Sequence, residues 1–515
     1  MATVESPPVD ARHLRTILIA VSIALMAVIA SVSGLNVAQT QMAVEFGATQ
    51  GTVLWIINIY TLALAALLLP LGALGDRLGR KPMLVTGLVV FGIASVAGGS
   101  APGIEVMLIA RVAAGVGAAM IMPITLAVIT ATFPEDQRGK AIGVWTGVAA
   151  GGGILGMFLS ALLVDIADWR WLFVLPVVLA AVALAMTLKS VPNSRERSGF
   201  AFDIVGALTS MVAVIALIFV LQEGSERGWT APATVIGFVV GLAAGFGFLA
   251  WELRRREAAL LDVRLFGERG LAGGSITLLV VFGVQAGIAV VLFPFFQAVL
   301  GWSGLLSTVA MLPMAGTMML ASGLAPKLAA RVGARATMAA GILVAAVGLA
   351  LLALLVSVDG GYPAVLPGLL AMGSGMGLSM TPSTEAITAA LPRAKQGVAS
   401  ALNDVTREFG TALGVALLGA LVSVGYRTAI EDRLSGIPAP AADTARDGIA
   451  NAVAVAGAET PGLVRAAQQS FVDGWQQAMW AGVAVMGVLF VYITLRGPRR
   501  VALDEGAAAA PVAAR

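Results

Sequence analysis

Fourteen separate stretches of about 20 apolar residues constrain the fold of this 515-residue chain more than any other feature. A helix needs about 20 apolar residues to cross the hydrocarbon core of a bilayer. Only 12% of the residues are charged, against about 25% in an average soluble protein. A soluble globule of this composition would expose apolar patches far larger than water tolerates. We therefore predict an all-α membrane protein. The predicted spans cover residues 16–38, 52–72, 82–100, 106–129, 140–163, 170–188, 204–222, 232–251, 271–299, 304–325, 336–357, 363–384, 397–424 and 472–495.

The lysines and arginines predict the orientation of the chain. With an even number of spans, both termini lie on the same side of the membrane. If that side is the cytoplasm, 25 of the 32 basic residues lie inside and six lie outside, while Arg111 lies within a span. Because cytoplasmic loops carry the excess of Lys and Arg, we predict an N-in, C-in topology. The first apolar stretch exceeds the length of a signal-peptide core, so we expect it to be retained.

Several kinds of chemistry are excluded by residues that the chain lacks. It has no cysteine, and its one histidine, His13, lies in the polar N-terminal tail. Disulfides, cysteine metal sites and histidine catalysis are therefore not expected. A phosphate-binding loop of the form G-x-x-x-x-G-K-[ST] is also missing, and the net charge of +3 gives no reason to expect nucleic acid. We expect a protein without cofactor or metal that is not an enzyme.

A short motif occurs twice, about half a chain apart. Residues 74–81 read LGDRLGRK and residues 328–335 read LAARVGAR, and both fit L-x-x-R-x-G-x-[RK]. Each copy joins two spans on the predicted cytoplasmic side. Such a repeat predicts two halves related by an axis along the membrane normal, with a binding site between them near the midplane.

This repeat also predicts where a gate would form. Glycines allow a tight turn and a close approach of helices, and the charged side chains can bond to each other or to a helix N-terminus of the other half. The residues assigned to a cytoplasmic gate are Gly72, Asp76, Arg77, Gly79, Arg80, Arg331, Arg407 and Glu408.

The predicted organisation has five parts. Cytoplasmic tails cover 1–15 and 496–515, six-helix bundles cover 16–190 and 270–495, and two inserted spans with a basic linker cover 191–269. Residues 425–470 form a long extracellular loop within the second bundle, part of which we expect to fold into short helices. We also expect a kink at Pro294.

The motifs resemble those of the major facilitator superfamily. Residues 72–81, GALGDRLGRK, match its signature for the loop between spans 2 and 3. Segments 108–117, 169–173, 228–230 and 397–410 are similar to the fourteen-span drug:proton antiporter branch, and the likeness extends over roughly residues 15–495. The resemblance implies alternating access by rocking of two six-helix halves, and it implies that Arg111 takes part in proton movement.

Two departures from this branch affect the expected coupling. Span 1 has Ser31 where the antiporters usually have Asp, and residues 156–161, GMFLSA, lack the proline and later glycines of the span 5 signature. Glycines upstream of this segment can still provide close packing. Export driven by protons is the leading expectation, and weak or absent coupling stays open as an alternative.

Charged residues inside spans are costly and are therefore functional candidates. We assign proton coupling to Arg111 and Asp404, and for Arg111 a structural role as a donor to carbonyl groups of neighbouring helices stays open as the alternative. Arg407 follows Asp404 by three residues, so a self-neutralised cluster at the inner gate is the alternative for this carboxylate. We expect no carboxylate at the midplane, which favours neutral, zwitterionic or amphiphilic substrates over cations.

Aromatic, amide and methionine side chains are the candidates for the cavity wall. They are Asn36, Trp55, Asn58, Tyr60, Met120, Met122, Trp145, Gln285, Phe293, Phe296 and Gln297. The predicted function is multidrug efflux of small hydrophobic or amphiphilic compounds, and the alternatives are a carrier of lipid or of a specific amphiphile and a sensor that does not transport. The expected partners are a small-molecule substrate, protons and membrane lipids, for a monomer in a bacterial plasma (inner) membrane.

Overall fold

The computed structural model describes residues 11–35, 38–48, 50–194, 202–457, 460 and 462–498. Within these residues, 14 helices are long and apolar enough to cross a membrane, so the predicted number of spans is confirmed. The helices are α1 (Ala11–Gly34), α2 (Gln39–Phe46), α3 (Gln50–Leu78), α4 (Arg80–Gly99), α5 (Ile104–Thr132), α6 (Glu135–Ile166), α7 (Val174–Ser190), α8 (Ile204–Arg227), α9 (Pro232–Arg255), α10 (Arg269–Pro294), α11 (Gly304–Val332), α12 (Ala334–Leu355), α13 (Gly361–Ala390), α14 (Gln396–Glu431), α15 (Ala439–Arg446), α16 (Ile449–Ala454) and α17 (Leu463–Arg496).

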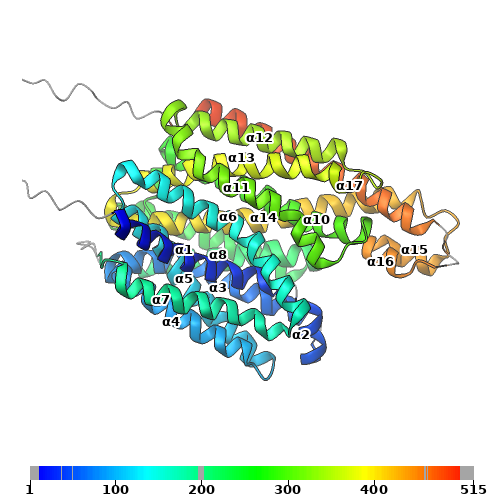
Figure 1. Ribbon diagram of the computed structural model, residues 1–515, viewed down its shortest axis with the longest axis horizontal. Helices are drawn as coiled ribbons and strands as arrows, with labels where there is room; N and C mark the ends of the chain where they lie inside the picture. Colours follow the sequence, from blue (N-terminus) through cyan, green and yellow to red (C-terminus); the bar gives the residue numbers. More distant parts are fainter. Residues whose placement is uncertain are drawn as a thin grey trace, which may run out of the picture.

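The long helices sort into two bundles (Figure 1). In the first bundle α4 packs on α5 and α7, and α1 packs on α6 and α7; in the second, α12 packs on α13 and α17, and α10 packs on α14 and α17. The packing pairs correspond if α1, α4, α5, α6 and α7 of the first bundle are matched with α10, α12, α13, α14 and α17 of the second. The bundles meet where α6 contacts α11 and where α14 contacts α3, which are equivalent contacts under the same correspondence. The helix packing therefore shows the relation that the repeated motif predicts.

The glycines of the repeated motif have the same backbone conformation in both copies. Gly79 has φ +114° between α3 and α4, and Gly333 has φ +95° between α11 and α12. Side chains with a Cβ rarely adopt this region. The glycine of each copy is thus required by the turn that joins its two spans.

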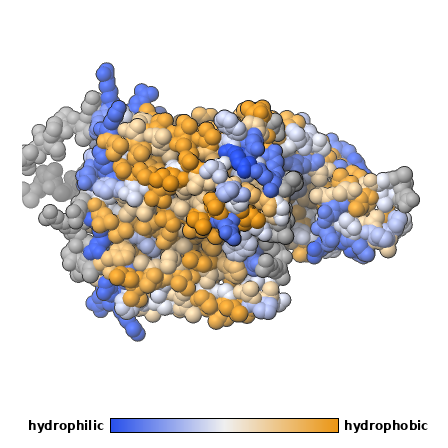
Figure 2. All heavy atoms as spheres, turned by 90° about the horizontal axis from the view of Figure 1, so that it is seen from below, coloured by the Kyte–Doolittle hydropathy of each residue, from blue (hydrophilic) through white to orange (hydrophobic). Residues whose placement is uncertain are grey.

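We name the two ends of the molecule for what lies there. The terminal end is where α1 begins and α17 ends, at the left of Figure 1, and the loop end carries α15 and α16. Apolar residues cover the visible face of the helical body between these ends, and polar residues gather toward the ends (Figure 2). An exposed apolar belt is what a lipid environment requires.

The inserted pair, α8 and α9, lies outside both bundles. Ala65 of α3 and Val214 and Ile218 of α8 form a small buried cluster against which Val405 and Phe409 of α14 pack. Since α3 and α14 belong to different bundles, α8 contacts both halves of the molecule.

Two predicted boundaries differ from the structure. We predicted a loop over residues 425–470, but α14 continues to Glu431 and α17 begins at Leu463. The loop is therefore shorter, and it contains the short helices α15 and α16. We expected a kink at Pro294 in the 271–299 span, and at this residue α10 ends and a single π-helical turn follows.

Candidate functional site

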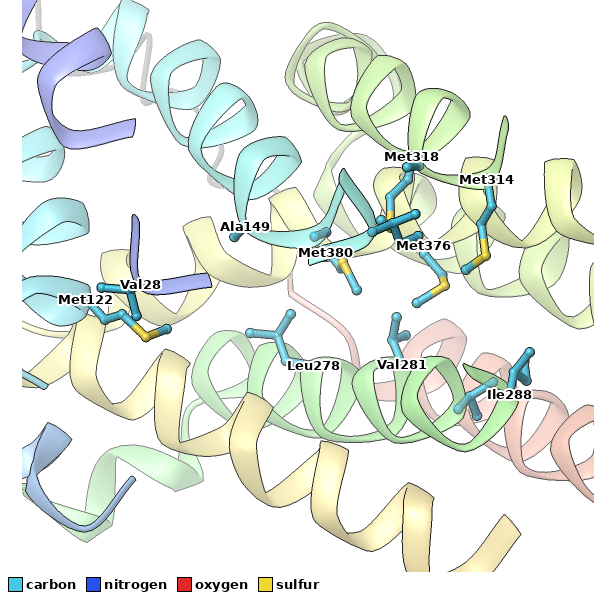
Figure 3. Packing of buried hydrophobic residues seen from close by; sticks show 14 of the residues in the cluster. Val28, Met122, Ala149, Leu278, Val281, Ile288, Met314, Met318, Met376 and Met380 are labelled. Atoms are coloured by element: carbon cyan, nitrogen blue, oxygen red, sulfur yellow. The ribbon is translucent and has the colours of Figure 1, made fainter. Parts of the chain in front are cut away.

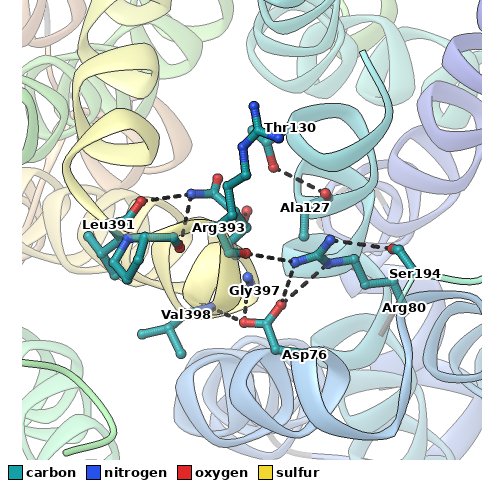
Figure 4. A network of polar contacts seen from close by, with 12 residues as sticks. Asp76, Arg80, Ala127, Thr130, Ser194, Leu391, Arg393, Gly397 and Val398 are labelled. Carbon is teal, nitrogen blue, oxygen red and sulfur yellow. Dashed lines mark hydrogen bonds and ion pairs between the residues drawn. The ribbon is translucent and has the colours of Figure 1, made fainter. Parts of the chain in front are cut away.

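At the terminal end, Asp76 joins the two bundles (Figure 4). This residue is in the last turn of α3, and its Oδ2 accepts hydrogen bonds from the backbone N–H groups of Gly397 (2.7 Å) and Val398 (3.3 Å) in the first turn of α14. Its Oδ1 accepts from Arg80 Nη2 at 2.9 Å. A carboxylate at a helix N-terminus satisfies unpaired N–H groups and the positive end of the helix dipole. This contact is the one expected from the sequence.

Arg80 extends the network to a third segment. Its guanidinium donates to the carbonyl oxygen of Arg393, and also to Ser194 Oγ beyond α7, both at 3.3 Å. The Arg393 side chain in turn donates to Glu135 at the start of α6, at 3.2 Å. Asp76 and Arg80 are 4% and 1% exposed, so their pairing is little weakened by water. The terminal end is closed in this structure.

Glycines bring the backbones together at the same place. A Cβ on Gly72 of α3 would lie 2.5 Å from the carbonyl oxygen of Gly397 on α14. On α6, a Cβ on Gly143 would lie 2.7 Å from the carbonyl oxygen of Ser322 on α11, while Gly139 and Gly151 lie against the side chains of Glu385 and Met319. The spacings of four and eight residues put these glycines on one face of α6.

The other two predicted gate arginines lie at the edge of this network. Arg77 stacks on the ring of Phe202, with its guanidinium carbon 5.9 Å from the ring centroid. Arg331 is exposed in the last turn of α11.

A cavity of about 290 Å³ lies between the bundles on the loop side of the closed gate. Its walls are mainly aliphatic and methionine side chains. Figure 3 labels four of them, Val28 and Met122 from the first bundle and Ile288 and Met314 from the second. This volume is close to the lower limit for a pocket that binds a drug-sized molecule. The polar lining residues include Gln285, Arg407 and Glu408.

Glu408 corrects one of our expectations. We expected no carboxylate in the cavity and assigned Arg407 and Glu408 to the gate, but both line the cavity. The Arg407 guanidinium carbon lies 4.3 Å from the ring centroid of Phe282 and 5.6 Å from that of Trp145. These two rings hold the arginine in place, and Glu408 supplies the negative charge that we thought was missing.

Asp404 lies behind Arg407, and its side chain is fully buried. One oxygen is 3.5 Å from Arg407 Nη1 and accepts from Asn403 at 3.2 Å. The other oxygen has no hydrogen-bond partner among the described residues. A buried carboxylate with an unsatisfied oxygen is costly unless it can exchange a proton or another ligand.

Arg111 is also buried, and no carboxylate pairs with it among the described residues. Its Nε donates to the carbonyl oxygen of Ile56 (3.1 Å), and Nη1 donates to Ser31 Oγ (3.2 Å). The guanidinium carbon lies 4.2 Å from the ring centroid of Tyr60, and Nη2 has no described hydrogen-bond partner. The serine that departs from the family pattern is thus in direct contact with the arginine.

Most of the predicted wall residues lie elsewhere. Among them only Gln285 and Met122 line the cavity. Tyr60 and Trp145 are one layer behind it: Tyr60 donates to Val28 and Trp145 donates to Thr125. Asn36 lies outside the described residues.

The remaining six residues predicted for the cavity wall do not belong to the lining of this cavity. Trp55 packs toward Phe219 of α8, and Phe296 belongs to an aromatic cluster with Trp302. Gln297 is exposed, and Met120 packs against Gly87 of α4. The six residues are Trp55, Asn58, Met120, Phe293, Phe296 and Gln297.

The sequence reasoning missed the aliphatic residues that form most of the wall. Val28, Ile154, Ile288 and Met314 resemble every other apolar residue in a span, so composition could not distinguish them. A helical face is the only available signal: Gln285, Ile288 and Leu292 are spaced by three and four residues on α10.

Known proteins are similar to this chain over nearly its whole length. A sequence profile described as Major Facilitator Superfamily matches residues 21–415. The multidrug resistance protein Stp of Mycobacterium tuberculosis is 30% identical over 92% of this chain and 90% of its own length. The multidrug efflux pump LfrA of Mycolicibacterium smegmatis is 30% identical over 88% and 89%. A puromycin resistance protein of Streptomyces alboniger is 33% identical over 82% and 84%.

Solved structures share the fold at low sequence identity. The proton:xylose symporter XylE has a TM-score of 0.59 and 14% identity over 95% of this chain and 97% of its own. A bacterial homolog of the human lysosomal transporter Spinster, in an inward-facing conformation, has a TM-score of 0.57 and 17% identity over 95% and 98%.

Proposed function

Because this chain belongs to the major facilitator superfamily, we propose that it exports small hydrophobic and amphiphilic compounds by alternating access, driven by the proton gradient. The observation that carries the proposal is the cavity between the bundles, closed at the terminal end by Asp76 and lined by aliphatic side chains. The relatives named for multidrug resistance and efflux support this class of substrate.

The polar residues of the cavity suggest which compounds it accepts. Glu408 supplies a counter-charge for a cationic group, Arg407 supplies one for an anionic group, and Gln285 can donate and accept hydrogen bonds. The aliphatic and methionine wall can bind apolar groups of different shapes. Cationic amphiphiles therefore fit this cavity as well as neutral ones.

Asp404 and Arg111 are the proposed coupling residues. Asp404 is buried directly behind the cavity, next to Arg407, so a proton on Asp404 would change the charge that the cavity presents. We propose that the terminal end faces the cytoplasm of a bacterial cell and that the protein resides in the inner membrane as a monomer. The excess of basic residues at this end supports the orientation.

One observation favours a second candidate, a carrier of a lipid or a specific amphiphile with weak proton coupling. Arg111 contacts the hydroxyl of Ser31 and not a carboxylate. A serine hydroxyl does not ionise near neutral pH, so this position cannot couple by titration of an acid.

Transport by purified protein in liposomes with an imposed pH gradient tests both candidates. We expect uptake of a fluorescent lipophilic cation in the wild type, a fall of about tenfold or more in Asp404→Asn, and no change in Glu105→Gln, which removes an exposed carboxylate in the first turn of α5. Glu408→Gln should reduce transport of the cation more than transport of a neutral dye. Equal flux with and without the gradient would refute the proton-driven proposal and favour the carrier.

A further inference from the structure

A groove runs along the outside of the first bundle between α4 and α7. Two adjoining hollows of about 490 Å³ and about 300 Å³ form it, and Val96 and Val177 line both of them. The groove follows α4 from Leu88 to Ser100, the residue after the helix, which is about 18 Å at a rise of about 1.5 Å per residue. One leaflet supplies half of the roughly 30 Å hydrocarbon core of a bilayer. The groove is therefore about as long as the acyl region of one leaflet is thick.

Small residues give the groove its shape. A Cβ on Gly92 of α4 would meet no atom within 4 Å, and Ala180 and Ala181 of α7 line the other side. Ile93 and Val96, which also line the groove, are 66% and 55% exposed. The groove is thus open to the surroundings of the bundle, and for a spanning helix these surroundings are acyl chains. A chain in the groove contacts two helices at once, which is more than a single helix face offers.

The groove becomes polar at the loop end, where Ser100, Arg170 and Trp171 line it. Trp171 is 53% exposed, and tryptophan is enriched at the level of the lipid headgroups. Arg170 Nη1 lies 2.6 Å from Glu45 Oε1 and 3.9 Å from Asp168 Oδ1. A guanidinium carries five N–H donors, so these ion pairs leave donors that can bind a phosphate. Polar groups therefore lie where the headgroup of a lipid in the groove would be.

The charges at this end favour one kind of headgroup. Arg170 is the only charged residue among the described residues that line the two hollows, and the exposed carboxylates of Glu45 and Asp168 flank it. One guanidinium beside two carboxylates repels a headgroup with a net negative charge. A headgroup that carries both a phosphate and a primary ammonium finds a partner for each charge.

We propose that this groove binds one phosphatidylethanolamine molecule of the leaflet at the loop end. One acyl chain lies between α4 and α7, the phosphate binds Arg170, and the ammonium binds Asp168 and Glu45. No lining residue of the groove belongs to the central cavity, so this lipid is a bound component of the protein and is not its transport substrate.

Native mass spectrometry of the full-length protein in detergent tests the site. Palmitoyl-oleoyl phosphatidylethanolamine or palmitoyl-oleoyl phosphatidylglycerol is titrated into the delipidated protein, and the fraction of chains with one bound lipid is measured. We expect one phosphatidylethanolamine per chain, bound about threefold or more tightly than phosphatidylglycerol. The measured mass also distinguishes a bound lipid from a second copy of the chain on the same surface.

Matched variants locate the lipid. Gly92→Trp fills the groove without meeting a neighbouring atom at its Cβ, so it should fold and bind phosphatidylethanolamine about tenfold or more weakly, because the ring displaces several methylene groups. Gly245→Trp adds the same ring at an equally open glycine of α9 and should bind as the wild type does. Asp168→Asn keeps an oxygen that can accept from the N–H of Arg170 and should lose the preference for phosphatidylethanolamine over phosphatidylglycerol.

Three results would overturn the proposal. They are a wild type that retains no phosphatidylethanolamine or binds phosphatidylglycerol equally well, a Gly92→Trp variant that binds as tightly as Gly245→Trp, and a dimer that Gly92→Trp alone abolishes. The unfolding midpoint of each variant without lipid shows whether a loss of binding reflects a loss of folding. None of these results bears on transport through the central cavity.

Discussion

Asp76 uses its two oxygens for two different partners. One oxygen binds the N-terminus of α14 in the other bundle, and the other binds Arg80 in its own bundle. Hydrogen bonds to a charged group contribute about 1.5–3 kcal/mol each. Loss of this side chain would therefore remove several charge-assisted hydrogen bonds from the closed terminal end.

Removal of this carboxylate should open the terminal end. The chain has no cysteine, so Ala401→Cys introduces one thiol at the buried contact between Gly72 and α14. In Asp76→Ala we expect this thiol to react with a water-soluble maleimide at least about tenfold faster than with Asp76 intact, because the open state becomes more populated. Asp432→Ala, which removes an exposed carboxylate at the loop end, is the control. An unchanged rate would show that Asp76 does not stabilise closure.

The coupling residues show how far single residues could be predicted. Charged residues in spans are rare, so Arg111, Asp404 and Glu408 could be found from sequence alone. The depth of these residues along their helices could not be predicted. Helix α14 is 36 residues long, and a shift of one turn moves a side chain from the gate to the cavity. Glu408 was placed wrongly for this reason.

At the scale of helices, glycine determines how closely the bundles approach. A side chain at Gly143 would meet the backbone of α11, whereas one at Gly245 of α9 would meet no atom within 4 Å. Such a contact cannot be relieved by rotating a side chain, because the obstacle is a carbonyl oxygen.

The same substitution should destabilise the protein at Gly143 and leave its stability unchanged at Gly245. Gly143→Val should lower the unfolding midpoint or separate α6 from α11, at a cost of about 1–3 kcal/mol. Gly245→Val should be neutral, because its neighbourhood is open. Thermal unfolding, together with the reactivity of Ala401→Cys, distinguishes destabilisation from opening. Equal behaviour of the two variants would contradict the close packing of α6.

At the loop end, an ion pair connects α17 to the loop before α13 in the second bundle. Arg465 in the first turn of α17 donates to Asp359 in the loop before α13, with Nη1 2.7 Å from Oδ1. This hydrogen bond from Arg465 lowers the pKa of Asp359 below its ordinary value. A carboxylate whose pKa is lowered by folding stabilises the protein above its unfolded pKa, and this contribution is lost as the pH falls through the folded pKa.

The stability difference between the wild type and Asp359→Asn should therefore depend on pH in one direction. We expect a small, constant difference in unfolding midpoint from pH 8 down to about pH 5, and a smaller difference below about pH 4. Both residues are exposed, so the difference is modest and should shrink in high salt. A difference that grows toward acid pH would contradict this assignment.

Helices and their pairing were largely predictable, because a lipid environment leaves few alternatives for an apolar stretch of this length. The repeat of residues 74–81 and 328–335 also predicted equivalent turns, and Gly79 and Gly333 show them. The ends of α14 and α17 were not predictable, since both helices continue beyond the membrane into polar sequence that resembles a loop.

At the scale of the whole molecule, the two bundles must separate at the terminal end for the cavity to become accessible from that end. The ion pair between Glu135 of α6 and Arg393 before α14 spans this opening. A link between these positions should hold the molecule closed.

Cross-linking tests this motion. The variant Glu135→Cys with Arg393→Cys, treated with a short bis-maleimide, should lose about nine-tenths or more of its transport in liposomes. The variant Glu135→Cys with Arg138→Cys places both thiols on α6 and should keep its transport after the same treatment. Full transport by the first cross-linked pair would exclude separation of the bundles at this end.

Glycines form the α6 side of its contact with α11, and at Gly143 the facing atom is a backbone carbonyl oxygen. Long side chains that interlock must each be confined to one rotamer whenever two surfaces meet, and that confinement costs entropy. Bare backbone has no rotamers to confine. The α6 side of this contact therefore has few side chains to reorder when the two halves meet, which makes this seam suited to a cycle of repeated closure.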